Sequence, residues 1–131
     1  MTWSSTAWCG SYLTRAAVLL RSADIEAKAV SRRFSDKELA RLAHKVALAR
    51  VEASQNMQVP PEVKRSHPHL LLALESYERA CHAAVQARHT DFLVALSKAR
   101  EESMVFSSLL KQDGWSLPKL AQVDSMRAAR G

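Results

Sequence analysis

Five histidines, two cysteines and thirteen acidic residues are the side chains from which a reactive or metal-binding site would be built. Glu78 and His82 are spaced i, i+4, so they share one side of a helix, as helical metal ligands do. A helical di-metal site needs a Glu-x-x-His pair twice and two further inward carboxylates, and the sequence lacks that pattern. Both residues also fall beside the apolar stripe of their helix, which favours a solvated pair. We therefore expect no metal and no cofactor.

Nucleophilic chemistry is equally unsupported by the pattern. Cys81 falls within an apolar stripe, where a thiol packs as a small hydrophobe and its pKa rises. Cys9 has no acid or base fixed near it in the sequence, and three glycines can hardly build a phosphate-binding or nucleophile loop. We expect two free thiols in a reducing compartment and no enzymatic activity.

Two charged residues are predicted to meet within the fold. Arg50 falls in the middle of an apolar helix side, and Glu102 lies near the edge of another. In an up-down-up-down bundle the second and fourth helices run parallel, which puts these residues at similar heights. The sequence predicts a partly buried Arg50–Glu102 ion pair that fixes register more than it stabilises.

Apolar periodicity predicts the helices that position these side chains. The clearest helix spans 66–88, with His67 as N-cap and Pro68 at the first helical position. The expected apolar stripe of this helix consists of Leu70, Ala73, Leu74, Tyr77, Ala80, Cys81, Ala84 and Val85.

Further helices are expected over 11–33, 36–57 and 90–112, with a short last one over 116–126. Ser35 and Glu38 form a capping box for the second helix, Thr90 or Asp91 caps the fourth, and Gly114 ends it. The expected stripe of the second helix consists of Leu39, Leu42, Ala43, Val46, Ala53 and Met57.

These elements predict an all-α antiparallel four-helix bundle with a short C-terminal fifth helix. Residues 1–131 form one domain in this prediction, because apolar residues make up 47% of the chain, enough for one core. An ordered loop over 57–66 carries Pro60-Pro61, and a loose basic tail covers 127–131.

The fourth helix is apolar on more sides than one core needs, which is typical of a helix that meets another molecule. The first functional hypothesis is therefore a non-catalytic interaction module, a small subunit or adaptor that docks within a larger assembly or self-associates. The predicted partner-binding residues are Trp3, Trp8, Leu93, Val94, Met104 and Val105.

A net charge of +6 supports an alternative hypothesis, in which basic residues of the first two helices form one face that binds nucleic-acid backbones without reading sequence. The residues of this predicted face are Arg21, Lys28, Arg32, Arg33, Arg41 and Lys45.

The sequence contains no apolar run of membrane-spanning length. Residues 1–23 contain no acid but carry Arg15, Arg21 and several hydroxyl residues, a composition that organellar targeting segments share. We expect a cytoplasmic location, with an organellar matrix as the alternative.

Overall fold

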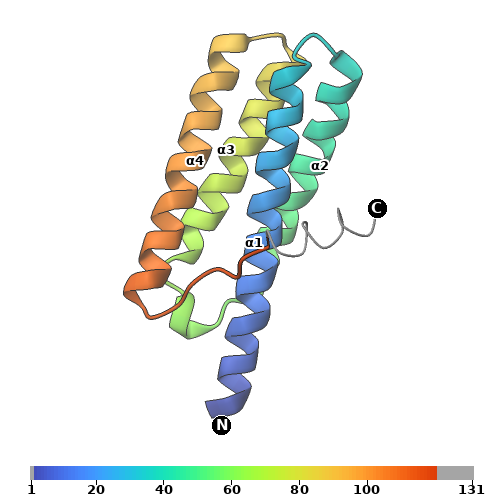
Figure 1. Cartoon of the computed structure of the whole chain (residues 1–131). Helices are drawn as coiled ribbons and strands as arrows, with labels where there is room; N and C mark the ends of the chain where they lie inside the picture. The colour runs from blue at the N-terminus through green and yellow to red at the C-terminus, as the bar shows by residue number, and fades with distance from the viewer. Residues whose placement is uncertain (1, 121–131) are drawn as a thin grey trace, which may run out of the picture.

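The computed structural model describes residues 2–120, with side chains from Ala7 onward. It contains α1 (Thr2–Arg32), α2 (Lys37–Gln55), the 3₁₀ turn η1 (Pro61–Val63), α3 (His67–Val85) and α4 (His89–Gln112). Residues 2–120 include no strand, so the all-helical prediction is confirmed. The four helices lie side by side along a common direction, and the first turns of α1 project beyond the others (Figure 1).

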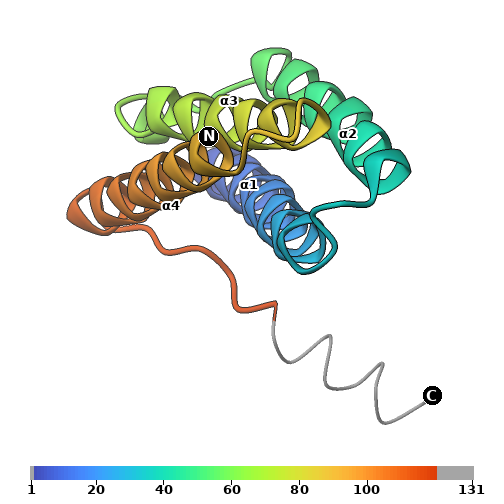
Figure 2. The same ribbon diagram turned by 90° about the horizontal axis from the view of Figure 1, so that it is seen from above.

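The helix α3 lies at the centre of the arrangement. It packs most extensively against α4 and α2, which flank it, and also against α1. Seen from above, α1 lies against this row of three helices, below α3 (Figure 2). The packing of α1 on α2 is lighter, and α1 has no comparable packing with α4. The bundle is therefore open along its α1–α4 side.

Small side chains build much of the core. Because alanine adds only a methyl group, helices that face each other through alanines can approach closely. The largest fully buried side chains, Phe92 and Phe106, belong to α4. The buried alanines of the first three helices include Ala16, Ala23, Ala27, Ala40, Ala43, Ala47, Ala73, Ala80 and Ala84.

The expected stripe of α2 was wrong in its register, although one of its members, Ala43, is buried. Leu42 and Val46 are 62% and 38% exposed, and Ala53 is exposed too. Leu39 and Met57 are only partly buried against the core. The face that is buried consists of Ala40, Ala43, Ala47, Arg50 and Ser54. Close approach of α2 to its neighbours leaves room for alanines on this face and directs the larger residues outward.

The starts of α2, α3 and α4 lie one residue from the predicted starts, whereas α1 begins at Thr2 and not at residue 11. The N-cap of α2 is Asp36, whose Oδ1 accepts from the amide of Leu39 at 3.0 Å, and not Ser35. Ser66, not His67, precedes the first residue of α3. Arg88 holds the N-cap position of α4, without a side-chain bond, so neither Thr90 nor Asp91 caps it.

The end of α4 follows the prediction. Gly114 adopts φ +86°, the Trp115 amide donates to the Leu110 carbonyl at 2.8 Å, and the Gly114 amide donates to Lys111 at 3.1 Å. Residues 115–120 are not helical, so the expected fifth helix does not start at Ser116. Its remaining part, 121–126, and the tail 127–131 lie outside the described residues.

Candidate functional site

The open side of the bundle forms a cleft of about 540 Å³ between α1 and α4. Its lining comes from four parts of the chain, because residues that follow α4 reach it as well. These are Ala17, Leu20, Arg21, Asp24, Ile25 and Lys28 of α1, Tyr77 of α3, Arg100, Ser103 and Met104 of α4, and Leu117, Pro118 and Leu120.

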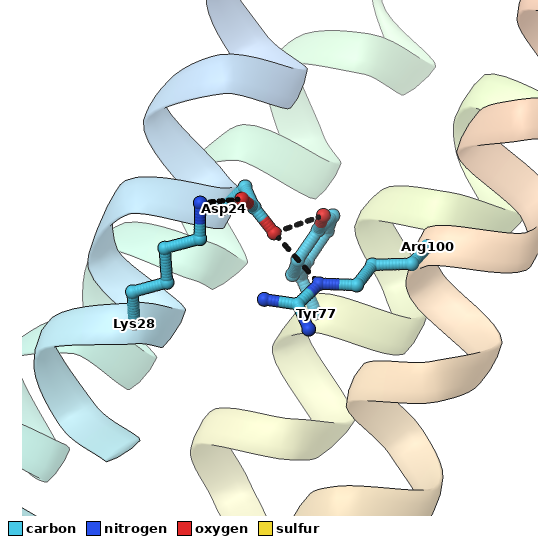
Figure 3. A network of polar contacts seen from close by, with 4 residues as sticks. All are labelled: Asp24, Lys28, Tyr77 and Arg100. Atoms are coloured by element: carbon cyan, nitrogen blue, oxygen red, sulfur yellow. Dashed lines mark hydrogen bonds and ion pairs between the residues drawn. The ribbon is translucent and has the colours of Figure 1, made fainter. Parts of the chain in front are cut away.

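A polar network centred on Asp24 joins three helices in this cleft (Figure 3). Asp24 Oδ1 accepts from the hydroxyl of Tyr77 at 3.0 Å and from Nε of Arg100 at 3.1 Å. Asp24 Oδ2 lies 3.1 Å from Nζ of Lys28, one turn further along α1. One carboxylate thus cross-links α1, α3 and α4 at a single height.

Burial and hydrogen bonding determine the protonation states of Asp24 and Tyr77 in this network. Burial alone raises the pKa of Asp24, but hydrogen bonds from Lys28, Arg100 and Tyr77 outweigh burial and lower it. Burial, reinforced by the Asp24 charge, raises the pKa of the Tyr77 hydroxyl. At neutral pH Asp24 is therefore ionised and Tyr77 protonated. Neither group is poised to exchange a proton, so the arrangement suits binding better than acid–base catalysis.

The rim of the cleft combines apolar surface with positive charge. Ile25 is 53% exposed and Met104 73% exposed. Within residues 2–120, Arg100 bonds Asp24 through Nε alone, which leaves its terminal guanidinium nitrogens available to a ligand. Lys28 is about half exposed beside it. Such a surface can hold an apolar group and an anionic group together.

The predicted partner-binding residues separate onto different surfaces. Leu93 and Met104 share a recess on α4 with Leu96, Ser97, Arg100 and Glu101, next to the cleft. Val94 lies in another groove, between α3 and α4, and Val105 is half-buried. Trp8 is 40% exposed near the start of α1, and the side chain of Trp3 lies outside the described part. Of the five whose side chains the structure describes, only Leu93 and Met104 share a recess.

The predicted basic face is also divided. Arg21 and Lys28 line the α1–α4 cleft, where Lys28 pairs with Asp24. Arg33 pairs with Asp36 at 2.8 Å. Arg41 and Lys45 are exposed on α2 and line no part of this cleft, and Arg32 is exposed at the end of α1.

The Arg50–Glu102 ion pair that the sequence predicted is not formed, so this prediction was wrong. Arg50 pairs with Glu26 and donates to the hydroxyl of Ser22 at 3.1 Å, both on α1. Glu102 accepts from His69 at 2.7 Å and from Lys98 at 3.0 Å. The reason is the order of the helices, because α2 and α4 lie on opposite flanks of α3 (Figure 2).

The residues considered for metal or thiol chemistry lie elsewhere. Glu78 bonds His44 of α2 at 2.9 Å, and the rings of His44 and His82 are 5.1 Å apart. Within the described chain, no group of three or more His, Cys, Asp or Glu residues has the geometry of a metal site.

Cys9 and Cys81 are free and buried. Burial, first of all, raises the pKa of each thiol to about 11. A neutral buried thiol is a poor nucleophile, so neither cysteine is set up for catalysis.

The central network was missed at the level of the sequence. The apolar period places Tyr77 in the stripe of α3, and no motif marks Asp24 or Arg100. The one available signal was the i, i+4 spacing of Asp24 and Lys28, which is common on wet helix faces and so identifies no site.

The fold and the cleft define a class: an all-helical bundle, open on one side, with a cation-rimmed apolar cleft. Comparison with family models, curated proteins and solved structures gave no match. No helix within residues 2–120 combines the length and hydropathy needed to cross a membrane.

Proposed function

We propose that this chain is a non-catalytic docking module, a small subunit or adaptor, and that its partner protein presents an acidic amphipathic helix to the α1–α4 cleft. The observation that carries the proposal is the open side of the bundle, whose walls expose Ile25 and Met104 beside Lys28 and Arg100. The two free buried thiols support a cytoplasmic location.

The shape of the cleft favours a helical ligand. Its α1 wall runs from Ala17 to Lys28, about 17 Å at a rise of about 1.5 Å per residue. About three turns of a partner helix fit this length, with apolar residues toward α3 as in other helix-in-groove complexes. Acidic residues on its flank would meet the guanidinium of Arg100 and the ammonium of Lys28.

The test is affinity capture from the native source with tagged variants. We expect Met104→Glu to abolish recovery of the partner, because it places a carboxylate in the apolar wall of the cleft. Leu42→Glu is the matched control, since Leu42 is similarly exposed but lies on α2, outside the cleft. Circular dichroism would establish that both variants stay folded.

Loss of the partner with Leu42→Glu alone, or equal recovery with both variants, would refute docking in this cleft. If the partner is retained by Met104→Glu but lost by Val94→Asp, the α3–α4 groove is the docking surface instead.

Nucleic-acid binding through the first two helices has less support, because the predicted basic residues are divided between the cleft and α2. Backbone binding is salt-dependent. A gel shift at low salt that disappears at high salt, and that Arg41→Glu with Lys45→Glu removes, would restore this alternative.

A further inference from the structure

We infer that the groove between α3 and α4 binds a small organic phosphate monoester, whose phosphate group is held by the Ser76 hydroxyl, Arg79 and Lys98. All three residues line this groove. The groove and the α1–α4 cleft share no lining residue, so the inference does not depend on the docking role proposed for the cleft.

Ser76 is a buried serine, 2% exposed, whose hydroxyl makes no hydrogen bond within residues 2–120. The other buried serines of this part, Ser54 and Ser66, donate to the carbonyls of Val51 and Val63 at 2.7 and 2.9 Å. A buried hydroxyl without a partner costs free energy. Because every described polar side-chain atom that is sealed from solvent has a partner, the unbonded Ser76 hydroxyl must open to solvent, and it does so at the groove.

Two cations lie at the same end of the groove as Ser76. The helices α3 and α4 form an antiparallel pair joined by residues 86–88 (Figure 1). Ser76 lies ten residues before Gln86, and Lys98 lies ten residues after Arg88, so the two face each other at one height. Arg79 follows Ser76 at i+3 and so lies on the same side of α3. Two basic side chains and one hydroxyl therefore converge from both walls.

The donors at this end match the three oxygens and the charge of a phosphate monoester, about −1.5 to −2 at neutral pH. Arg79 is exposed and forms no ion pair within the described chain, so its guanidinium can donate two parallel bonds. Lys98 contacts Glu102 at 3.0 Å, and its ammonium has three N–H donors. No carboxylate lines this end, because Glu102 lies outside the groove and Asp91 pairs with Arg88 at the other end, at 3.7 Å.

Beyond the cations, the walls of the groove become apolar. Ala83 of α3 faces Val94 and Ala95 of α4, and Val94 is 65% exposed. From Ser76 to Ala83 the wall is about 10 Å long, at a rise of about 1.5 Å per residue. The groove has a volume of about 400 Å³, a size typical of small-ligand clefts. An organic group on the ester oxygen would cover Val94, which inorganic phosphate would leave exposed.

The test is calorimetric titration of the full chain with phenyl phosphate, whose ring supplies the apolar group. We expect saturable binding of one molecule per chain, with NMR shifts at the amides of Ser76, Arg79, Val94 and Lys98. Benzoate has one charge and two oxygens, and inorganic phosphate has no ring, so each should bind several-fold more weakly. Absence of saturable binding, or shifts confined to other parts of the chain, would overturn the inference.

Two substitutions test the residues that hold the phosphate. Ser76→Ala should weaken binding about tenfold, because it removes a hydrogen bond to a charged group. The variant should stay folded, since the hydroxyl has no partner in the described fold, and circular dichroism checks this. Ser97→Ala, exposed on α4 outside the groove, is the control. Arg79→Gln should also weaken binding about tenfold, with Arg41→Gln, exposed on α2, as the control of equal charge.

Equal weakening by Arg79→Gln and Arg41→Gln would overturn the inference, because the attraction would then come from the net charge of the protein. Unchanged affinity in Ser76→Ala would overturn it too. Binding of a phosphoserine peptide without binding of phenyl phosphate would replace the small-molecule site by a site for a phosphorylated chain. Met104→Glu should bind phenyl phosphate as the parent does, so failure of partner capture and failure of this site remain distinguishable.

Discussion

Asp24 is the residue whose removal should disturb the cleft most. Its carboxylate is only 27% exposed and accepts from Tyr77, Lys28 and Arg100, and charged hydrogen bonds are stronger than neutral ones. We expect Asp24→Asn to lower the free energy of unfolding by about 1–2 kcal/mol in urea denaturation at pH 7.

Asp91→Asn provides the control, because the Arg88–Asp91 pair is largely exposed at 3.7 Å and should be worth less than about 0.5 kcal/mol. The effect at Asp24 should also depend on pH. Since its pKa is lowered by folding, its contribution is present above the ordinary value of 3.8 and is lost as the pH falls through the folded value. Equal losses for both variants at pH 7 would contradict the network's role.

Ala87 is the one described residue other than glycine with a positive φ, +57°. It ends α3 through amide bonds from Arg88 to Ala83 and from Ala87 to Ala84, a geometry usually given to glycine. We expect Ala87→Gly to stabilise the protein by about 0.5–1 kcal/mol in thermal unfolding.

An alanine-to-glycine substitution inside a helix should instead lower the stability of the protein. Ala49 is exposed within α2, where Ala49→Gly should cost about 1 kcal/mol. If both substitutions destabilise equally, the strain assigned to Ala87 is absent.

Among the helices, α2 shows most clearly what periodicity does and does not determine. The sequence pattern predicted that α2 is helical and amphipathic, and it is. Two neighbouring stripes satisfy the same period, and the larger side chains of Leu42 and Val46 favour the one that contains them. The structure buries the other, because the distance between helices decides which sizes fit, and that distance is set by all of the helices together.

The register of α2 can be tested by volume. Ala47→Leu should cost about 1–3 kcal/mol, because the alanine is 1% exposed in the core and added methylenes overpack it. Leu42→Ala should change stability by less than about 0.5 kcal/mol, because Leu42 is mostly exposed. Urea denaturation of both variants measures the difference, and the reverse order would restore the predicted stripe.

Local sequence signals predicted the helices and the breaks between them better than they predicted which helices and residues contact one another. Pro60-Pro61 and Gly114 marked breaks that the structure has, since both act on the backbone nearby. Arg50 was correctly placed on an inward side, yet its partner was wrong. Which helix flanks which is decided by packing across the whole chain, so the Asp24 network and the cleft could not be predicted from spacing either.

For the molecule as a whole, His67 should govern the first loss of stability on acidification. Its ring is buried, and its Nδ1 lies 2.7 Å from the Tyr12 hydroxyl, which donates to the neutral ring. Burial lowers the pKa of His67 below the ordinary 6.5, against a smaller opposing effect of a hydrogen bond to the Ser54 backbone.

Because the unfolded chain binds this proton more readily, stability should fall as the pH drops below about 6.5. We expect His67→Gln to flatten the dependence of the melting temperature on pH between about pH 6.5 and 5. An unchanged slope in His67→Gln would assign the acid sensitivity to other groups.

The central place of α3 has a consequence for how the chain comes apart. The helices α2, α3 and α4 follow one another in sequence and pack as neighbours, whereas α1 packs less extensively against the others. Contacts between helices that follow one another in sequence require only short loops to close. The helices α2, α3 and α4 can therefore assemble early, and they can remain packed after α1 has detached. Native-state hydrogen exchange should then give a lower free energy of opening for the amides of α1 than for those of α3. This difference would mean that α1 detaches first, while α2, α3 and α4 stay packed together.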